Sequence, residues 1–284
     1  MIIDQAPIEY VFHIQDDYQV QLLQSHFDLF YKKLAEQKGS AQKKTDGVQR
    51  YLSGMPNHNF NIILGCPTPE SDSDQCIKEQ LAYFAEQGVS FIWYVNEDAS
   101  PSFKEKLIKY GFVDEGIFQG VIGALETPIA PTSIPEGYTL ESVKDEASMQ
   151  EFNELVCNVF GIKGAARDIY KNFLWKMANQ DAPRMFHWMV RKNGKAVSTV
   201  STMIQEGVCS FWNGASISDE RKQGLNTGLR RFALQDAMKR GCRFGTSYLR
   251  SDCPAFGICK KLGYQTKWNI HAYHSPTNTK NKEV

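Results

Sequence analysis

The sequence Arg221-Lys222-Gln223-Gly224-Leu225-Asn226-Thr227-Gly228 leads directly into the helical pattern Leu229-Arg230-Arg231-Phe232-Ala233-Leu234. A glycine-containing loop that opens a helix leaves the first backbone N–H groups unpaired, beside the positive end of the helix dipole. Together these features bind anions. Gly224 allows a positive φ and a close backbone approach, and Asn226 tolerates the left-handed region well. The stretch therefore predicts a phosphate site.

The segments around this loop alternate between strand and helix patterns. Asn193-Gly194 lies between two β-rich runs and is a strong hairpin signal. Taken in order, the second half is expected to contain a strand at 138–143, helices at 146–160 and 166–179, strands at 184–190, 196–204 and 208–217, the glycine loop, a helix at 228–240, a strand at 242–249, a helix at 255–262 and a last strand at 268–273.

Length and composition indicate a soluble, two-domain protein. The chain has 284 residues, with 32 basic and 32 acidic side chains, so no net charge favours nucleic acid or an anionic membrane. The start of the chain shows no secretion signal, and no apolar run is long enough to span a bilayer. Seven cysteines without a CxxC pair indicate reduced thiols. We therefore expect a cytoplasmic location.

The two halves of the sequence resemble one another. Gly88 and Gly241, which lie 153 residues apart, each end a helix pattern that is followed by a strand and a second helix. Three prolines between residues 128 and 137 exclude regular structure and predict a linker. The expected domains are 1–127 and 138–274, with a disordered tail at 275–284. Helix, glycine, strand and helix also follow one another in many α/β proteins, so duplication is an interpretation.

This order of elements resembles the GNAT superfamily of acyl-CoA-dependent acyltransferases, most strongly over residues 196–264. The family signature is Arg or Gln, two residues, Gly, one residue, then Gly or Ala. Arg221 and Gly224 match it, and Asn226 departs from it. The resemblance implies an α/β fold with two GNAT-like domains, each a mostly antiparallel sheet flanked by helices. It also implies acetyl-CoA as co-substrate, without a metal.

The resemblance further implies which residues bind the cofactor. The strand before the loop would pair through its backbone with the pantetheine amides, the loop would hold the pyrophosphate, and a polar residue after the next strand would lie near the cofactor. The expected cofactor-binding residues are Ala215, Ser216, Ile217, Arg221, Lys222, Gln223, Gly224, Leu225, Asn226, Thr227, Gly228 and Ser251.

A second block, from Ser251 to Tyr264, resembles the closing pattern of the family. There a tyrosine followed by two residues, Leu, Gly and an aromatic often protonates the departing CoA thiolate. Cys259 occupies the tyrosine position, and a thiol can in principle donate that proton. Cys259 is therefore a candidate general acid, or else a small residue that lines the cleft. Glu206 is expected in a solvent-facing turn, and the sequence does not identify the general base.

The first half lacks the cofactor loop. Thr68 to Asp74 contains no glycine and three carboxylates, which would repel a pyrophosphate. We therefore expect a degenerate GNAT-like domain that shapes the acceptor cleft or stabilises the second domain. His271 and His274 should point to opposite faces of a strand, and His58 has no ligand at metal-binding spacing, so no metal site is expected.

The leading hypothesis is an N-acetyltransferase that transfers an acetyl group from acetyl-CoA to a primary amine by direct attack. The acceptor would be a small-molecule amine or a protein amino group, with no nucleic-acid or membrane partner. One alternative is a non-catalytic acyl-CoA-binding module. An aminoacyl-tRNA-dependent aminoacyltransferase is disfavoured because the net charge is zero.

Overall fold

The computed structural model describes residues 8–38, 43–45, 47–69, 72–125 and 132–276. The expected α/β fold is confirmed: eleven strands in this part of the chain form one mixed sheet, in the order β1-β2-β3-β4-β11-β5-β10-β9-β8-β7-β6. The strands are β1 (Lys43–Thr45), β2 (Val48–Leu52), β3 (Asn61–Gly65), β4 (Ile92–Asn96), β5 (Val113–Ala124), β6 (Tyr138–Ser142), β7 (Arg184–Lys192), β8 (Lys195–Gln205), β9 (Val208–Ser216), β10 (Phe244–Arg250) and β11 (Gln265–His274).

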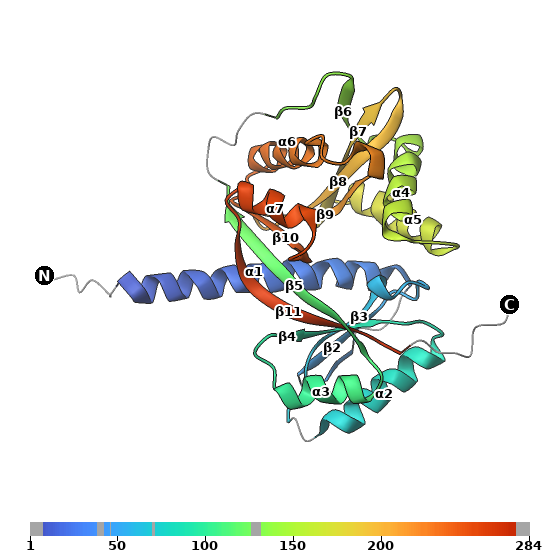
Figure 1. Ribbon diagram of the computed structural model, residues 1–284, viewed down its shortest axis with the longest axis vertical. Coiled ribbons are helices and arrows are strands. Elements are labelled where there is room, and N and C mark those ends of the chain that lie inside the picture. The colour runs from blue at the N-terminus through green and yellow to red at the C-terminus, as the bar shows by residue number, and fades with distance from the viewer. Residues whose placement is uncertain (1–7, 39–42, 46, 70–71, 126–131, 277–284) are drawn as a thin grey trace, which may run out of the picture.

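Helices cover both faces of this sheet (Figure 1). The α-helices are α1 (Ile8–Ala35), α2 (Ser73–Glu86), α3 (Pro101–Lys109), α4 (Glu146–Phe160), α5 (Ala166–Ala178), α6 (Leu225–Lys239) and α7 (Pro254–Lys261). Within the described part of the chain, none of them is long and apolar enough to cross a membrane.

The two halves exchange their last strands. β11 pairs with β4 and β5, while β5 pairs with β10 and β11. Each half therefore inserts its final strand between two strands of the other half. The result is a continuous sheet, in which β5 and β11 run from the upper half of the molecule into the lower half (Figure 1).

The internal resemblance seen in the sequence corresponds to a structural repeat. The series α2, β4, α3 and β5 matches α6, β10, α7 and β11 in order and in spacing. Gly88 and Gly241 follow the first helix of each series with φ of 67° and 84°, and Gly111 and Gly263 follow the second with 86° and 80°. Glycine adopts these values without the steric penalty of a side chain, which explains the matched helix ends.

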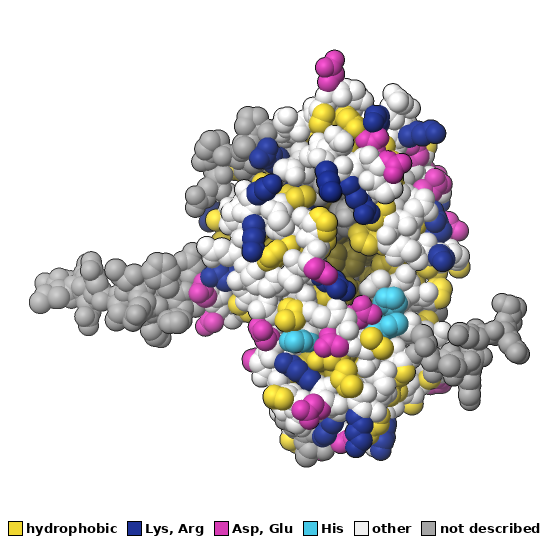
Figure 2. Space-filling view, viewed as in Figure 1, with side chains coloured by type: hydrophobic (Ala, Val, Ile, Leu, Met, Phe, Trp, Pro, Cys, Tyr) yellow, Lys and Arg dark blue, Asp and Glu magenta, His cyan; other side chains and the backbone are white. Residues whose placement is uncertain are grey.

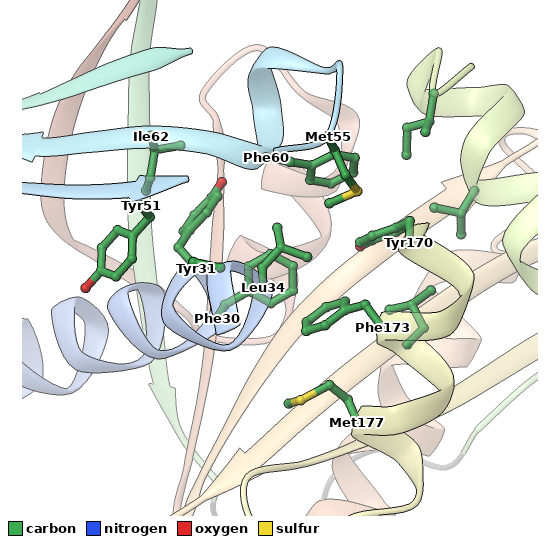
Figure 3. Packing of buried hydrophobic residues seen from close by; sticks show 14 of the residues in the cluster. Phe30, Tyr31, Leu34, Tyr51, Met55, Phe60, Ile62, Tyr170, Phe173 and Met177 are labelled. Carbon is green, nitrogen blue, oxygen red and sulfur yellow. The ribbon is translucent and has the colours of Figure 1, made fainter. Parts of the chain in front are cut away.

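The helix α1 joins the halves through one hydrophobic core. Its side chains pack against β2 and β3 of the first half and against α5 of the second half (Figure 3). Phe30 stacks on Trp212 of β9, with ring centroids 3.7 Å apart. Phe27 contacts both Tyr94 of β4 and Tyr248 of β10, so a single helix seals the middle of the long sheet.

The opposite face of the sheet carries two larger cores and one small cluster, Cys209, Ala237 and Cys242. One includes Trp93, Phe103 and Phe112 and lies under α2 and α3. The other includes Phe211, Leu229 and Tyr264 and lies under α6 and α7. The halves are therefore distinct on this face and continuous on the α1 face.

The ends of the expected domains fall partly outside the described residues, namely at 126–131 and 277–284. Within the described part of the linker, Ile134 packs against Gly228 of α6. Ser275, expected in the tail, is buried and its N–H donates to the carbonyl of Phe91 at 2.9 Å. Ser275, one residue beyond the end of β11, is therefore part of the packed structure.

Candidate acyl-CoA site

The strands β9 and β10 run parallel and then separate. Their pairing begins at Val208 with Phe244 and ends at Phe211 with Ser247, although β9 continues to Ser216 and β10 to Arg250. A register shift against β8 lies beside Asn213, whose φ is 53°. Such a bulge bends a strand, so the separation is built into the backbone.

The glycine loop follows β9 directly. Ser218–Glu220 form a short 3-10 turn, and Lys222 and Gly224 take positive φ values of 65° and 77°. The helix α6 begins at Leu225, three residues before the start expected from the sequence, because the left-handed Gly224 turns the chain into the helix. Residues 225–228 are thus the first helical turn.

This first turn offers unpaired donors. The first helical hydrogen bond runs from the N–H of Gly228 to the carbonyl of Gly224 at 2.9 Å, and Gly224 has no side chain to cap the helix. The N–H groups of residues 225–227 therefore lie outside the helical ladder. Arg221, Lys222 and Gln223 are exposed beside them, which is the arrangement of an anion site.

The acidic residues before the loop are held by other groups. Lys192 donates to Glu220 at 2.8 Å and Tyr138 donates to it as well, and these bonds lower the pKa of the Glu220 carboxyl. The Asp219 carboxylate accepts from the Ser218 hydroxyl at 3.0 Å. The positive charges of Arg221 and Lys222 have no such carboxylate partner among the described residues, so the loop keeps a local positive character.

The strand residues predicted to contact pantetheine already make several bonds. The N–H of Ile217 donates to the carbonyl of Val197 at 3.1 Å, and the carbonyl of Ala215 accepts from the Ser198 hydroxyl at 3.0 Å. The carbonyl of Ser216 accepts from Arg221 Nε at 3.3 Å.

The remaining predicted residues differ in exposure. Leu225 and Gly228 are buried, so they can offer the cofactor only backbone groups, and Thr227 is half-buried. Ser251 is exposed in the turn after β10. Glu206 is exposed in a hairpin turn, as expected.

Asn226 points into the protein rather than toward the loop surface. Its Nδ2 donates to the carbonyl of Thr199 at 3.2 Å, and its Oδ1 accepts from Arg230 Nε at 3.1 Å. Arg230 Nη1 lies 3.7 Å from Cys259 Sγ on α7. A chain of polar contacts therefore runs from β8 through α6 to α7, across the inner side of the strand separation.

Cys259 is buried, with 1% of its surface exposed. Burial raises the pKa of the Cys259 thiol, and the Arg230 guanidinium opposes part of this rise. Arg230 was not among the site residues predicted from the sequence. The available signal was its place four residues after Asn226, on the inward face of an amphipathic helix.

The other side of the separation is lined by aromatic residues. Trp212 and Tyr248 face α1, and the Tyr248 hydroxyl donates to the carbonyl of Leu23 at 2.7 Å. The Tyr170 hydroxyl of α5 donates to Asn213 Oδ1 at 2.6 Å. Figure 2 shows a hollow with a hydrophobic floor between the two halves, on the side of α5.

The equivalent place in the first half is filled. The parallel pairing of β3 and β4 ends at Leu64 with Tyr94, and the Trp93 indole N–H donates to the Gly65 carbonyl at 2.8 Å. Residues 70 and 71 of the acidic segment lie outside the described residues, and its Asp74 accepts from Tyr110 at 2.8 Å. This half offers no glycine loop at a helix start in its described residues.

The histidines that looked unrelated in sequence come together. The rings of His58 and His274 lie 4.3 Å apart, and Glu115 Oε1 lies 3.8 Å from His274 Nδ1. Burial and the neighbouring His274 lower the pKa of His58. Sequence spacing could not show this pair because it joins the two halves. Within the described ranges, no group of three or more metal-ligating side chains is arranged to hold a metal ion.

Solved structures with a similar fold include GCN5-related N-acetyltransferases. One from Kribbella flavida matches over 86% of this chain and 94% of its own, with a TM-score of 0.63 and 16% identity. One from Sphaerobacter thermophilus matches over 80% and 76%, with a TM-score of 0.63 and 13% identity. A tandem GNAT protein from the clavulanic acid biosynthesis pathway matches over 82% and 79%, with a TM-score of 0.54 and 11% identity.

No protein-family model matches the sequence, and neither does any curated protein. The structural likeness defines the class of fold: the chain has the GCN5-related N-acetyltransferase fold, with two tandem GNAT-like domains. This confirms the fold inferred from the loop and from the internal repeat. At these identities, activity has to be argued from the chemistry of the site.

Proposed function

We propose that the C-terminal half binds acetyl-CoA and transfers its acetyl group to a primary amine. The observation that carries the proposal is the glycine loop at the start of α6, placed directly after a strand that separates from its parallel neighbour. The loop supplies backbone donors and positive charge for a pyrophosphate. Beyond Phe211, β9 is no longer paired with β10 in the described part of the chain, so a pantetheine arm would add along this edge as in β-strand addition.

In the proposed reaction the amine nitrogen attacks the thioester carbonyl, and the carbon–sulfur bond breaks with its electron pair on sulfur. Much of the rate enhancement would come from holding amine and thioester together at the strand separation. The hollow beside α5 gives the amine a route that does not cross the cofactor loop. The acceptor is a small-molecule amine or a protein amino group, in a cytoplasmic setting.

A non-catalytic acyl-CoA-binding module is the second candidate. One observation favours it: Asn226, Arg230 and Cys259 form a contact chain across the space between α6, α7 and β9. If these contacts remain when CoA binds, they would prevent the thioester from reaching the hollow.

Thermal unfolding with CoA and acetyl-CoA tests the shared part of both candidates. A ligand that binds only the folded state raises the melting temperature. Absence of any shift with either compound would contradict both. If CoA binds, release of free thiol from acetyl-CoA in the presence of a panel of primary amines separates the enzyme from the module. Arg221→Ala removes one positive charge of the loop without changing the hydrophobic core. We therefore expect CoA to raise the melting temperature of this variant less than that of the unaltered protein.

A further inference from the structure

Arg230 places a positive charge inside the C-terminal half. Only 4% of its surface is exposed. In the described part of the chain its hydrogen-bond partners are an amide oxygen and a thiol, and no carboxylate forms an ion pair with it. Burying a charge without a counter-charge is costly, so buried cations are normally paired. An anion that forms in this cleft would supply the missing partner.

The guanidinium lies at the point where β9 and β10 separate. Its Cζ is 4.6 Å from the ring centroid of Phe211, which forms the last pair of the two strands with Ser247. A Cβ built on Gly214, beyond this pair, would lie 3.3 Å from Arg230 Nη2. A larger residue at 214 would crowd the guanidinium. The cation is thus aimed at the apex of the separated strands.

The same cation lies next to the residue that stands in the tyrosine position of the resembled family. Arg230 Nη1 is 3.7 Å from Cys259 Sγ. A cysteine side chain ends one atom beyond Cβ, whereas a tyrosine would extend a ring and a hydroxyl further into this space. Here the guanidinium fills the space beside the short side chain. A permanent cation therefore stands close to where a proton donor is expected.

We propose that Arg230 stabilises the CoA thiolate as a fixed cation, in place of a general acid. This inference rests on the proposed function. As the amine attacks and the carbon–sulfur bond breaks, the electron pair remains on sulfur, and Arg230 donates hydrogen bonds to it without losing a proton. The amine proton passes to solvent, and the thiolate takes a proton from solvent after release. Cys259 then needs no acid role.

The physical basis is preorganised charge. A guanidinium remains protonated throughout the working pH range and offers several donors in a fixed plane. Charge that is already in place where a negative charge develops is effective, because no reorganisation is needed during the reaction. Removing the charge of Arg230 should therefore weaken the binding of the thiolate form of CoA much more than that of the thiol form.

The test compares CoA with desulfo-CoA, which lacks the thiol, on the full-length protein between pH 6 and 9. Competition titrations give both dissociation constants at each pH. We expect CoA to gain affinity over desulfo-CoA with a midpoint at least about one pH unit below the ordinary thiol pKa of about 8.5. The ultraviolet absorbance of the thiolate, measured as a difference between the two complexes, gives the same pKa independently.

Arg230→Met should remove the shift while CoA still binds, and Arg230→Lys should restore part of it. Cys259→Ala is the matched control and should leave the shift in place. Binding of CoA with an unshifted thiol pKa in the unaltered protein would overturn the inference and leave the proposed function standing. Failure of the unaltered protein to bind either compound would overturn the proposed function first. Because the decisive measurement uses the unaltered protein, a variant that fails to fold does not prevent the test.

Discussion

The two halves share one series of elements but use the space at the strand separation differently. In the first half, β4 carries Trp93, whose indole closes the gap beside Gly65. In the second half, β10 carries Gly245, Thr246 and Ser247 at the corresponding place. In the first half the large side chain lies on β4 itself, whereas in the second half Tyr264 occupies the space over Gly245, and the strands separate only beyond Ser247. A duplicated fold can thus retain its architecture while the residues beside the strand separation change.

The halves also differ in what covers them. α4 and α5 lie over the α1 face of the second half, whereas the first half relies on α1 alone. A cavity of about 480 Å³ remains in the first half beside α1, lined in part by Gln24, Asp28 and Gln49. The open space of the first half therefore lies on the α1 face, and the proposed cofactor space of the second half lies on the face of α6 and α7.

Removing the contact between the halves should have the largest effect on the free energy of unfolding. Phe30→Ala deletes a buried ring that stacks on Trp212, and truncation of a buried phenylalanine costs about 3–5 kcal/mol. Because β5 and β11 also join the halves, we expect one cooperative transition at a lower denaturant concentration. Urea unfolding followed by far-UV circular dichroism and by tryptophan fluorescence measures this. Two separated transitions would show that the halves are independent units.

Ile169→Ala is the matched control for this variant. Ile169 lies on α5, a helix of the same core, but 39% of its surface is exposed. Its truncation should cost no more than about 1 kcal/mol, because little apolar area is lost.

Low pH should weaken the second half through His187. Burial lowers the pKa of His187 from 6.5 to about 4, and the neutral ring lies 2.7 Å from the Ser201 hydroxyl. Below pH 6.5 the unfolded chain binds a proton that the folded chain does not, so stability falls between pH 6.5 and 4 and then levels off. The full loss is about 3 kcal/mol.

The free energy of unfolding measured at several pH values checks this, with His187→Gln as the comparison. The variant should show a shallower dependence on pH between 6.5 and 4. An unchanged slope in the variant would rule out His187 as a source of the dependence. Burial also lowers the pKa of His26 to about 4. His26→Gln should therefore likewise show a shallower dependence of stability on pH, and because His26 lies on α1, that measurement reports on the helix that joins the halves.

The sequence predicted what depends on local pattern. Gly224 and the helix after it, the hairpin at Asn193-Gly194 and the matched glycines each follow from the conformations that short segments prefer. The long helix α1 was missed, although it makes the core that joins the halves. The exchange of β5 and β11 was missed because alternation of side chains shows which face of a strand is buried and does not show which strand is its neighbour.

The same distinction between local pattern and distant contacts applies to the candidate site. The glycine loop could be predicted as the start of a helix, because its residues belong to one continuous stretch. Its binding of a phosphate stays a prediction. The helical spacing could have placed Arg230 on the inward face of α6, but its contacts could not be predicted, because Phe211, Gly214 and Cys259 come from three separate elements. Pairwise contacts between distant residues are the part that a single sequence does not contain.

Adding a methyl group at Gly245, one of the small residues of β10, should have an intermediate effect on the free energy of unfolding. A Cβ on Gly245 would lie 1.9 Å from the Tyr264 hydroxyl, so Gly245→Ala forces the buried tyrosine to shift. Overpacking of this kind costs about 1–3 kcal/mol. Gly257→Ala is the control: nothing lies within 4 Å of its Cβ, and in α7 alanine should stabilise by roughly 0.5–1 kcal/mol. Thermal unfolding of both variants should give melting temperatures that move in opposite directions.

The smallest effect is expected on the affinity for CoA, from the exposed charges of the glycine loop, which the first half replaces with an acidic segment. Replacing both Arg221 and Lys222 with alanine removes two exposed positive charges beside the unpaired N–H groups of α6. The affinity for CoA should fall about tenfold, or about 1.4 kcal/mol, with no change in unfolding. Lys239→Ala, at the other end of α6, should leave the affinity unchanged. Because exposed charges are screened, the difference between the double variant and the unaltered protein should shrink as salt is raised. An equal loss of affinity in the double variant and in Lys239→Ala would mean that net charge, and not the loop, attracts the cofactor.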